Sequence, residues 1–102
     1  MLRPITVLLV LLAAPACNPN GTCVLEDPNE GTYHPSTCMI NYGKRACDGT
    51  HEVFFQEDST AGLLRCKLAG FEAIDSRTSH DNEKKLQNGD VVILFRTTKP
   101  KP

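Results

Sequence analysis

The sequence has no tryptophan, two tyrosines and four phenylalanines, so few aromatic side chains can anchor a core or an interface. Its charges nearly cancel, giving a formal net charge of −1. Proteins that bind nucleic acid or anionic membranes usually show a basic excess, so we expect neither partner. No Cys-x-x-Cys pair occurs, and His34, His51 and His80 have no second ligand at helical or strand spacing. We therefore expect no metal and no cofactor.

Catalytic signatures are also lacking. No glycine-rich phosphate loop and no serine or threonine in a nucleophile elbow can be found in the chain. The composition therefore favours a non-enzymatic protein.

Residues 1–16 have the pattern of a removable export signal. Arg3 supplies the positive start, a mostly apolar stretch follows, and Ala14-Pro15-Ala16 offers small residues at the cleavage position. The apolar stretch is about half of the roughly 20 residues that a membrane span needs. We predict a secreted protein with one small domain over residues 17–96 and a disordered tail over 97–102.

The five cysteines are an odd number for an oxidising compartment. We predict that Cys23, Cys38, Cys47 and Cys66 form two disulfides, each contributing about 2–4 kcal/mol of stability. Four cysteines allow three pairings. We favour Cys23–Cys66 with Cys38–Cys47, because the first bond would tie the earliest strand to the middle of the fold.

Cys17 would be the first residue after cleavage, so it has its own interpretations. It can carry the lipid of a bacterial lipoprotein, although Ala14-Pro15-Ala16 departs from the usual lipobox. Otherwise it is a terminal thiol or pairs between chains. Asn20 lies in an Asn-Gly-Thr sequon and is a glycosylation site if the source is eukaryotic.

Short segments of strand character alternate with turn residues along the mature chain. Residues 63–74 alternate most clearly, because Leu64, Cys66 and Leu68 would share one strand face. We expect a central strand at 52–56 and a strand buried on both faces at 91–95. The polar interval 75–90 is either a loop or a short helix from Ser79. The remaining expected segments are 22–25, 37–42 and 44–47. The predicted fold is all-β: a small disulfide-stapled β-sandwich or barrel of about six short strands.

One segment supports an alternative function. Residues 53–64 resemble the C-terminal hairpin of small microbial guanyl-specific ribonucleases, in which an acidic turn and Ala-Gly precede a strand with a catalytic histidine. In this chain Arg65 or Cys66 takes that position. The resemblance implies a secreted ribonuclease that needs an acid–base pair and a cation. The groups available for this chemistry are His51, Glu57, Arg65 and His80.

The mature domain as a whole is similar in outline to the MAX-type effectors of plant-associated fungi. That resemblance implies a six-stranded β-sandwich, a bridge such as Cys23–Cys66, and binding of host proteins through sheet edges. The leading hypothesis is therefore a non-enzymatic secreted effector that binds a host protein through edge strands and the 75–90 loop. By residue type, the expected interface anchors are Tyr33, Tyr42 and Arg65.

Overall fold

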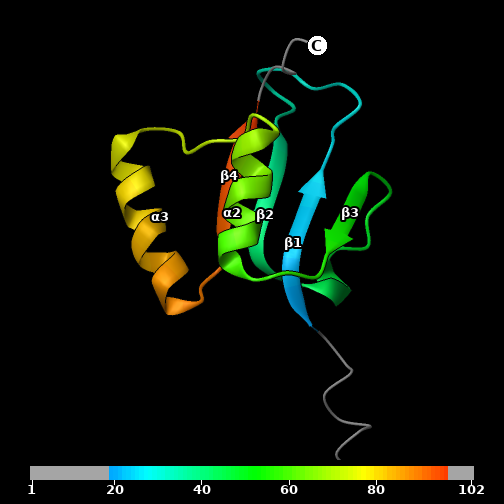
Figure 1. Ribbon diagram of the computed structural model, residues 1–102. Helices are drawn as coiled ribbons and strands as arrows, with labels where there is room; N and C mark the ends of the chain where they lie inside the picture. The colour runs from blue at the N-terminus through cyan, green and yellow to red at the C-terminus, as the bar shows by residue number, and fades with distance from the viewer. Residues whose placement is uncertain (1–18, 97–102) are drawn as a thin grey trace, which may run out of the picture.

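The computed structural model describes residues 19–96. Four strands form one sheet, and two helices of more than two turns follow the third strand (Figure 1). A single 3-10 turn, η1, follows the second strand. The elements are β1 (Asn20–Leu25), β2 (Ser36–Gly43), η1 (Lys44–Ala46), β3 (Glu52–Phe55), α2 (Ser59–Leu68), α3 (Ser76–Asn88) and β4 (Val92–Arg96).

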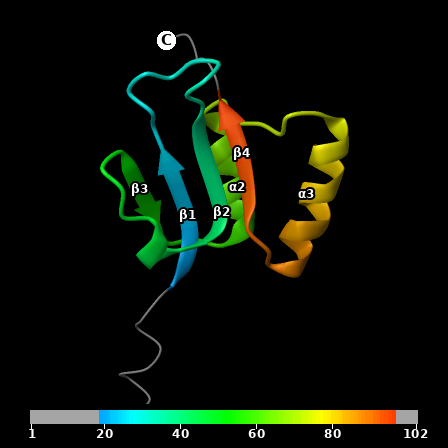
Figure 2. The ribbon, with the colours of Figure 1, turned by 180° about the vertical axis from the view of Figure 1, so that it is seen from behind.

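The sheet is antiparallel and has the strand order β3-β1-β2-β4. α2 lies across one face, over β1 and β2, and α3 stands beside β4 (Figure 1). Seen from behind, the other face is covered by neither α2 nor α3, and we call it the helix-free face (Figure 2). The domain therefore has two layers where α2 covers the sheet and one layer elsewhere.

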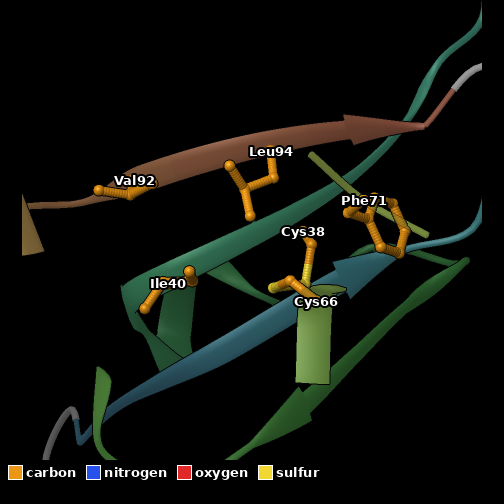
Figure 3. Close-up of a cluster of buried hydrophobic side chains, with 6 residues drawn as sticks. All are labelled: Cys38, Ile40, Cys66, Phe71, Val92 and Leu94. Atoms are coloured by element: carbon orange, nitrogen blue, oxygen red, sulfur yellow. A yellow bond between two sulfur atoms is a disulfide. The ribbon is translucent and has the colours of Figure 1, made fainter. Parts of the chain in front are cut away.

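The main core lies between the sheet and α2. Its buried members come from β2, β4, α2 and the segment after α2, and Figure 3 shows them converging: Cys38, Ile40, Cys66, Phe71, Val92 and Leu94. A second cluster occupies the helix-free face, where Cys23, Met39 and Cys47 are buried beneath Tyr42 and Phe54. Each face of the sheet thus has its own cysteine pair.

α2 replaces the strand that the alternation of residues 63–74 predicts. Asp58 caps its first turn, accepting a hydrogen bond from the Ala61 N–H at 2.8 Å. Gly62 and Cys66 are the buried residues of α2, and Leu63 packs beside them. Leu64 and Leu68 fall on the opposite side, because residues four apart stack on a helix. The alternation of Leu64, Cys66 and Leu68 therefore predicts a strand where the chain forms a helix, and that prediction is wrong.

α3 confirms the helical interpretation of the polar interval, with different limits. It begins three residues before Ser79, because the Asp75 carboxylate accepts a hydrogen bond from the Thr78 N–H and caps the helix. It ends at Asn88, and Gly89 forms the C-cap with a φ of 80°, the left-handed conformation that favours glycine. The interval is thus mostly a capped helix and not a loop.

The fold is a small, disulfide-stabilised mixture of sheet and helices, and not the predicted all-β sandwich or barrel. The predictions of strands at 22–25, 37–42, 52–56 and 91–95 are confirmed within a residue or two. Two placements are wrong: β3 and β4 are the edges of the sheet, although we expected one to be central and the other buried on both faces. The expected segment at 44–47 is mostly the 3-10 turn η1. The export signal 1–16, Cys17 and the tail 97–102 lie outside residues 19–96.

Candidate functional site

The two disulfides join Cys23 to Cys47 and Cys38 to Cys66. The four predicted residues are therefore the bonded ones, but the favoured pairing is wrong. Cys38 lies opposite Val24 in the β1–β2 register, so Cys38 and Cys23 project from opposite faces of the sheet. A Cys23–Cys66 bond would have to pass through the sheet. Stable disulfides of this kind indicate an oxidising environment.

The Cys38–Cys66 bond fixes α2 to β2 (Figure 3). Close packing at Gly62 reinforces this attachment: a Cβ there would overlap Thr22 Oγ1 and lie 3.2 Å from Ile40 Cγ2. The position of α2 on the sheet is thus set by one covalent bond and one close backbone approach.

The outward side of α2 is apolar. We call Ala61, Leu64 and Leu68 the α2 outer face; they follow helical spacing, and Leu64 and Leu68 are 60% and 78% exposed. A shallow depression runs along this face, bordered on one side by Glu57 and Arg65. Sequence reasoning missed this surface, because Leu64 and Leu68 were assigned, together with Cys66, to one face of a strand.

Arg65 is held rigidly at the border of this face. Its Nε and Nη2 donate to the two oxygens of Glu57, each at 2.9 Å, and its guanidinium lies 3.6 Å from the centre of the Phe55 ring. The hydrogen bonds from Arg65 lower the pKa of Glu57, and those to Glu57 raise the pKa of Arg65. The pair therefore stays charged over the physiological range and places a flat cation beside Leu64 and Leu68.

A second arginine is buried and structural. Arg96 Nη1 donates to Ala69 O at 2.8 Å, and Nη2 donates to Glu26 Oε2 at 2.8 Å and Glu30 Oε1 at 3.0 Å. Its guanidinium also lies 4.4 Å from the centre of the Phe71 ring. Burial would lower the pKa of Arg96, but the hydrogen bonds to the two glutamates outweigh it and raise that pKa. Arg96 thereby ties the end of β4 to the β1–β2 loop and the end of α2.

The three predicted interface anchors do not share a surface. Tyr33 is 90% exposed in the β1–β2 loop, Tyr42 packs against the cluster on the helix-free face, and Arg65 lies on α2. Arg65 is the member that borders the exposed apolar surface. The predicted glycosylation residue, Asn20, is exposed at the start of β1.

The structure brings together half of the groups that the ribonuclease resemblance requires. Glu57 and Arg65 form an ion pair, but His51 immediately precedes β3 and His80 is in α3. β3 and α3 lie at opposite sides of the sheet (Figure 1). Residues 53–64 also form a strand followed by a helix, and not the strand–turn–strand hairpin that the resemblance implies.

Within residues 19–96, one group of side chains has its possible metal-ligand atoms close enough together to hold an ion: Cys23, Cys47 and Glu52. Glu52 Oε2 lies 3.4 Å from Cys23 Sγ, but the two sulfurs are bonded to each other and offer no thiolate. Neither helix in the described part of the chain has the length and hydropathy required to cross a membrane.

Comparison of the chain with protein-family models, curated proteins and solved structures finds no match.

Proposed function

We propose that the chain is a secreted, non-enzymatic protein of effector type that binds a host protein through the α2 outer face. The observation that carries this proposal is the exposure of Leu64 and Leu68 on a helix whose inner side is covalently fixed. Adjacent exposed leucines are unfavourable in water, and such patches commonly mark protein-binding surfaces. The two disulfides support export, since they form and persist in oxidising compartments.

The geometry favours a partner that presents an apolar groove, into which the exposed leucines of α2 would insert. Leu64 and Leu68 are one helical turn apart, a spacing typical of anchors that fill a hydrophobic groove. Arg65 beside them is of the residue type enriched at binding hot spots, and the Glu57 ion pair orders it before contact. The disulfide fixes the position of α2 in advance, so little conformational freedom remains to be lost on binding.

The test begins with partner isolation from host extract by lysine-reactive cross-linking to the secreted protein. The affinity of the purified partner is then measured for the wild type and for the Leu64→Glu/Leu68→Glu variant. We expect the variant to weaken binding at least about tenfold, because two anchors are lost and charge is introduced into an apolar contact. The matched control is Ile74→Glu, which changes an exposed apolar residue outside the α2 outer face.

Unchanged affinity of the double variant would place the contact elsewhere, for example on the edge strands β3 and β4. If the cross-linked partner is a second copy of the chain, the proposal of a host partner is wrong. The variants should keep their fold, because Leu64, Leu68 and Ile74 are all exposed. Circular dichroism under non-reducing conditions checks this.

A further inference from the structure

Two pairs of adjacent basic residues occur in the sequence, and they lie in different structural settings. Lys44-Arg45 is in η1, the single turn that follows β2, whereas Lys84-Lys85 is inside the 13-residue helix α3. Lys44, Arg45 and the following Ala46 are all exposed, and η1 contains no buried residue. Exposed turns of this kind are preferred sites of proteolytic cleavage.

The peptide bond between Arg45 and Ala46 is crossed by both disulfides. Each disulfide joins a cysteine before this bond to a cysteine after it: Cys23 to Cys47 and Cys38 to Cys66. Hydrolysis of the bond would therefore leave the two portions of the chain covalently joined at two points. The bond that follows Lys84-Lys85 differs, because all four cysteines precede it and neither disulfide would retain β4.

The strand pairing also interlocks the two portions. The portion before the bond supplies β1 and β2, which are neighbours in the middle of the sheet (Figure 1). The portion after it supplies β3, which pairs with β1, and β4, which pairs with β2. The first portion is thus held between two strands of the second, so the fold does not depend on an unbroken chain at η1.

Cleavage requires the turn and the end of β2 to open locally. The Lys44 N–H donates to Pro19 O at 2.9 Å, and the Cys47 N–H donates to Lys44 O at 3.1 Å across the bond to be cleaved. Opening η1 breaks these hydrogen bonds but exposes no buried side chain of the turn. Gly43 already has an extended backbone, with φ −75° and ψ 138°, as proteases require of a bound substrate.

A bulge lets this opening stop within β2. The β1–β2 register is irregular near its end, where Asn41 has a φ of 61°, and such a bulge disrupts the ladder locally. Tyr42 and Gly43 therefore form a short terminal segment, and terminal segments open at a lower free energy than the whole fold. The opening can extend over residues 42–46 while the Cys47 disulfide stays intact.

The other basic pair is protected by its helix. Lys84 and Lys85 lie within α3, whose ends are capped at Asp75 and Gly89. An extended substrate conformation there would break several consecutive hydrogen bonds between residues four apart. The structure thus favours cleavage at the first pair over the second.

We propose that a serine protease specific for paired basic residues hydrolyses the Arg45–Ala46 bond during export, so that the secreted protein consists of two chains joined by both disulfides. Acidic pockets of the protease would receive the side chains of Lys44 and Arg45. The Arg45 acyl group passes to the serine and then to water, while the Ala46 nitrogen takes a proton and leaves. Arg45 gains a carboxylate, Ala46 gains an ammonium group, and the mass rises by one water molecule. This inference rests on the export included in the proposed function, but not on the α2 outer face.

The first test treats the purified, disulfide-intact protein with kexin, a serine protease that cleaves after Lys-Arg pairs. We expect one cut after Arg45, a mass increase of one water molecule without reductant, and two separate chains after reduction. The far-ultraviolet circular dichroism of the cut, unreduced protein should match that of the intact protein. Arg45→Gln should abolish the cut.

The matched control is Lys85→Arg, which gives α3 the same Lys-Arg recognition pair. Cleavage after position 85 of this variant should be at least about tenfold slower than cleavage after Arg45 of the same molecule, because the helix must unwind first. Both rates come from one digestion, so enzyme activity and protein stability are equal for the two sites.

The second test is mass spectrometry of the protein in the secreted fraction of the producing cells, before and after reduction. We expect a chain that begins at Ala46 to appear on reduction. A single chain that continues through residues 45–46 in this fraction would overturn the inference alone. Absence of the protein from the secreted fraction would instead contradict export, and the proposed function would fail with it.

Two results of the kexin digestion would also overturn the proposal. One is resistance of the folded protein under conditions that cleave the reduced, unfolded chain after Arg45. The other is cleavage after position 85 of the Lys85→Arg variant as fast as cleavage after Arg45.

Discussion

Replacing Cys38 and Cys66 together with alanine tests how α2 is attached. The two cysteines are fully buried, and 28 residues of sequence separate them. The loop-closure model gives about 3.6 kcal/mol for a bond of this span. Because Gly62 and Cys66 are the buried residues of α2, loss of the bond should also free the helix locally. We expect the free energy of unfolding to fall by about 3–4 kcal/mol.

The matched control is the replacement of Cys23 and Cys47 with alanine. Their separation of 24 residues gives about 3.4 kcal/mol in the same model, so the entropic loss is nearly equal. That bond lies on the helix-free face and does not contact α2.

Urea unfolding measures the free energies, and hydrogen exchange measures the protection of the amides of α2. Exchange in α2 should accelerate strongly in the Cys38/Cys66 variant and remain slow in the Cys23/Cys47 variant. Equal protection of α2 in both would refute the argument that the disulfide holds this helix.

Three further predictions concern packing, the buried arginine and pH. Gly62→Ala should lower stability by about 1 kcal/mol or more, because the added Cβ overlaps Thr22 Oγ1. Arg96→Met should cost about 3 kcal/mol or more, because buried Glu30 loses its cation. The Glu57 pKa is lowered below 4.5 in the folded state, so its stabilisation is present above about pH 4.5 and is lost as the pH falls through the folded value. Glu57→Gln should therefore flatten the acid-induced loss of stability.

Thermal and urea unfolding across pH 2–7 check these three predictions, each against a control with the same chemical change at an exposed or open position. The controls are Gly31→Ala, where the nearest atom to the added Cβ is 3.8 Å away, Arg77→Met and Glu83→Gln. If Gly62→Ala were as stable as Gly31→Ala, the argument from close packing at Gly62 would be contradicted. If Arg96→Met were as stable as Arg77→Met, the argument from the buried ion pair with Glu30 would be contradicted. An acid transition unchanged by Glu57→Gln would exclude the Glu57–Arg65 pair as its cause.

The strands could be predicted from the sequence because their side chains alternate or are β-branched between clear turn residues. β1, β2 and β4 have this character, and the structure places them close to the predicted limits. α2 could not be recognised from the same signal. Its alternating Leu64, Cys66 and Leu68 fit a strand, whereas the helical pattern of Gly62, Leu63 and Cys66 is short and includes a glycine. Asp58 as an N-cap was the available clue.

The disulfide pairing, the α2 outer face and the burial of Asn82 depend on information that a single sequence does not carry. The pairing follows from the register that places Cys23 and Cys38 on opposite faces. The α2 outer face follows from knowing that Leu64 and Leu68 lie on a helix. The burial of Asn82 follows from packing of α3 beside β4, which its polar sequence does not indicate.

The most direct test of the central claim is site-specific photo-cross-linking from position 68 in the secreted protein mixed with host extract. A benzophenone side chain replaces Leu68 in one sample and Ile74 in the other; both positions are exposed, but only the first lies on the α2 outer face. We predict one dominant adduct with a host protein from position 68, which excess unlabelled wild-type protein abolishes and excess Leu64→Glu/Leu68→Glu variant does not. Equal adducts from both positions, or competition by the double variant as strong as by the wild type, would contradict the claim that this helix is the binding surface.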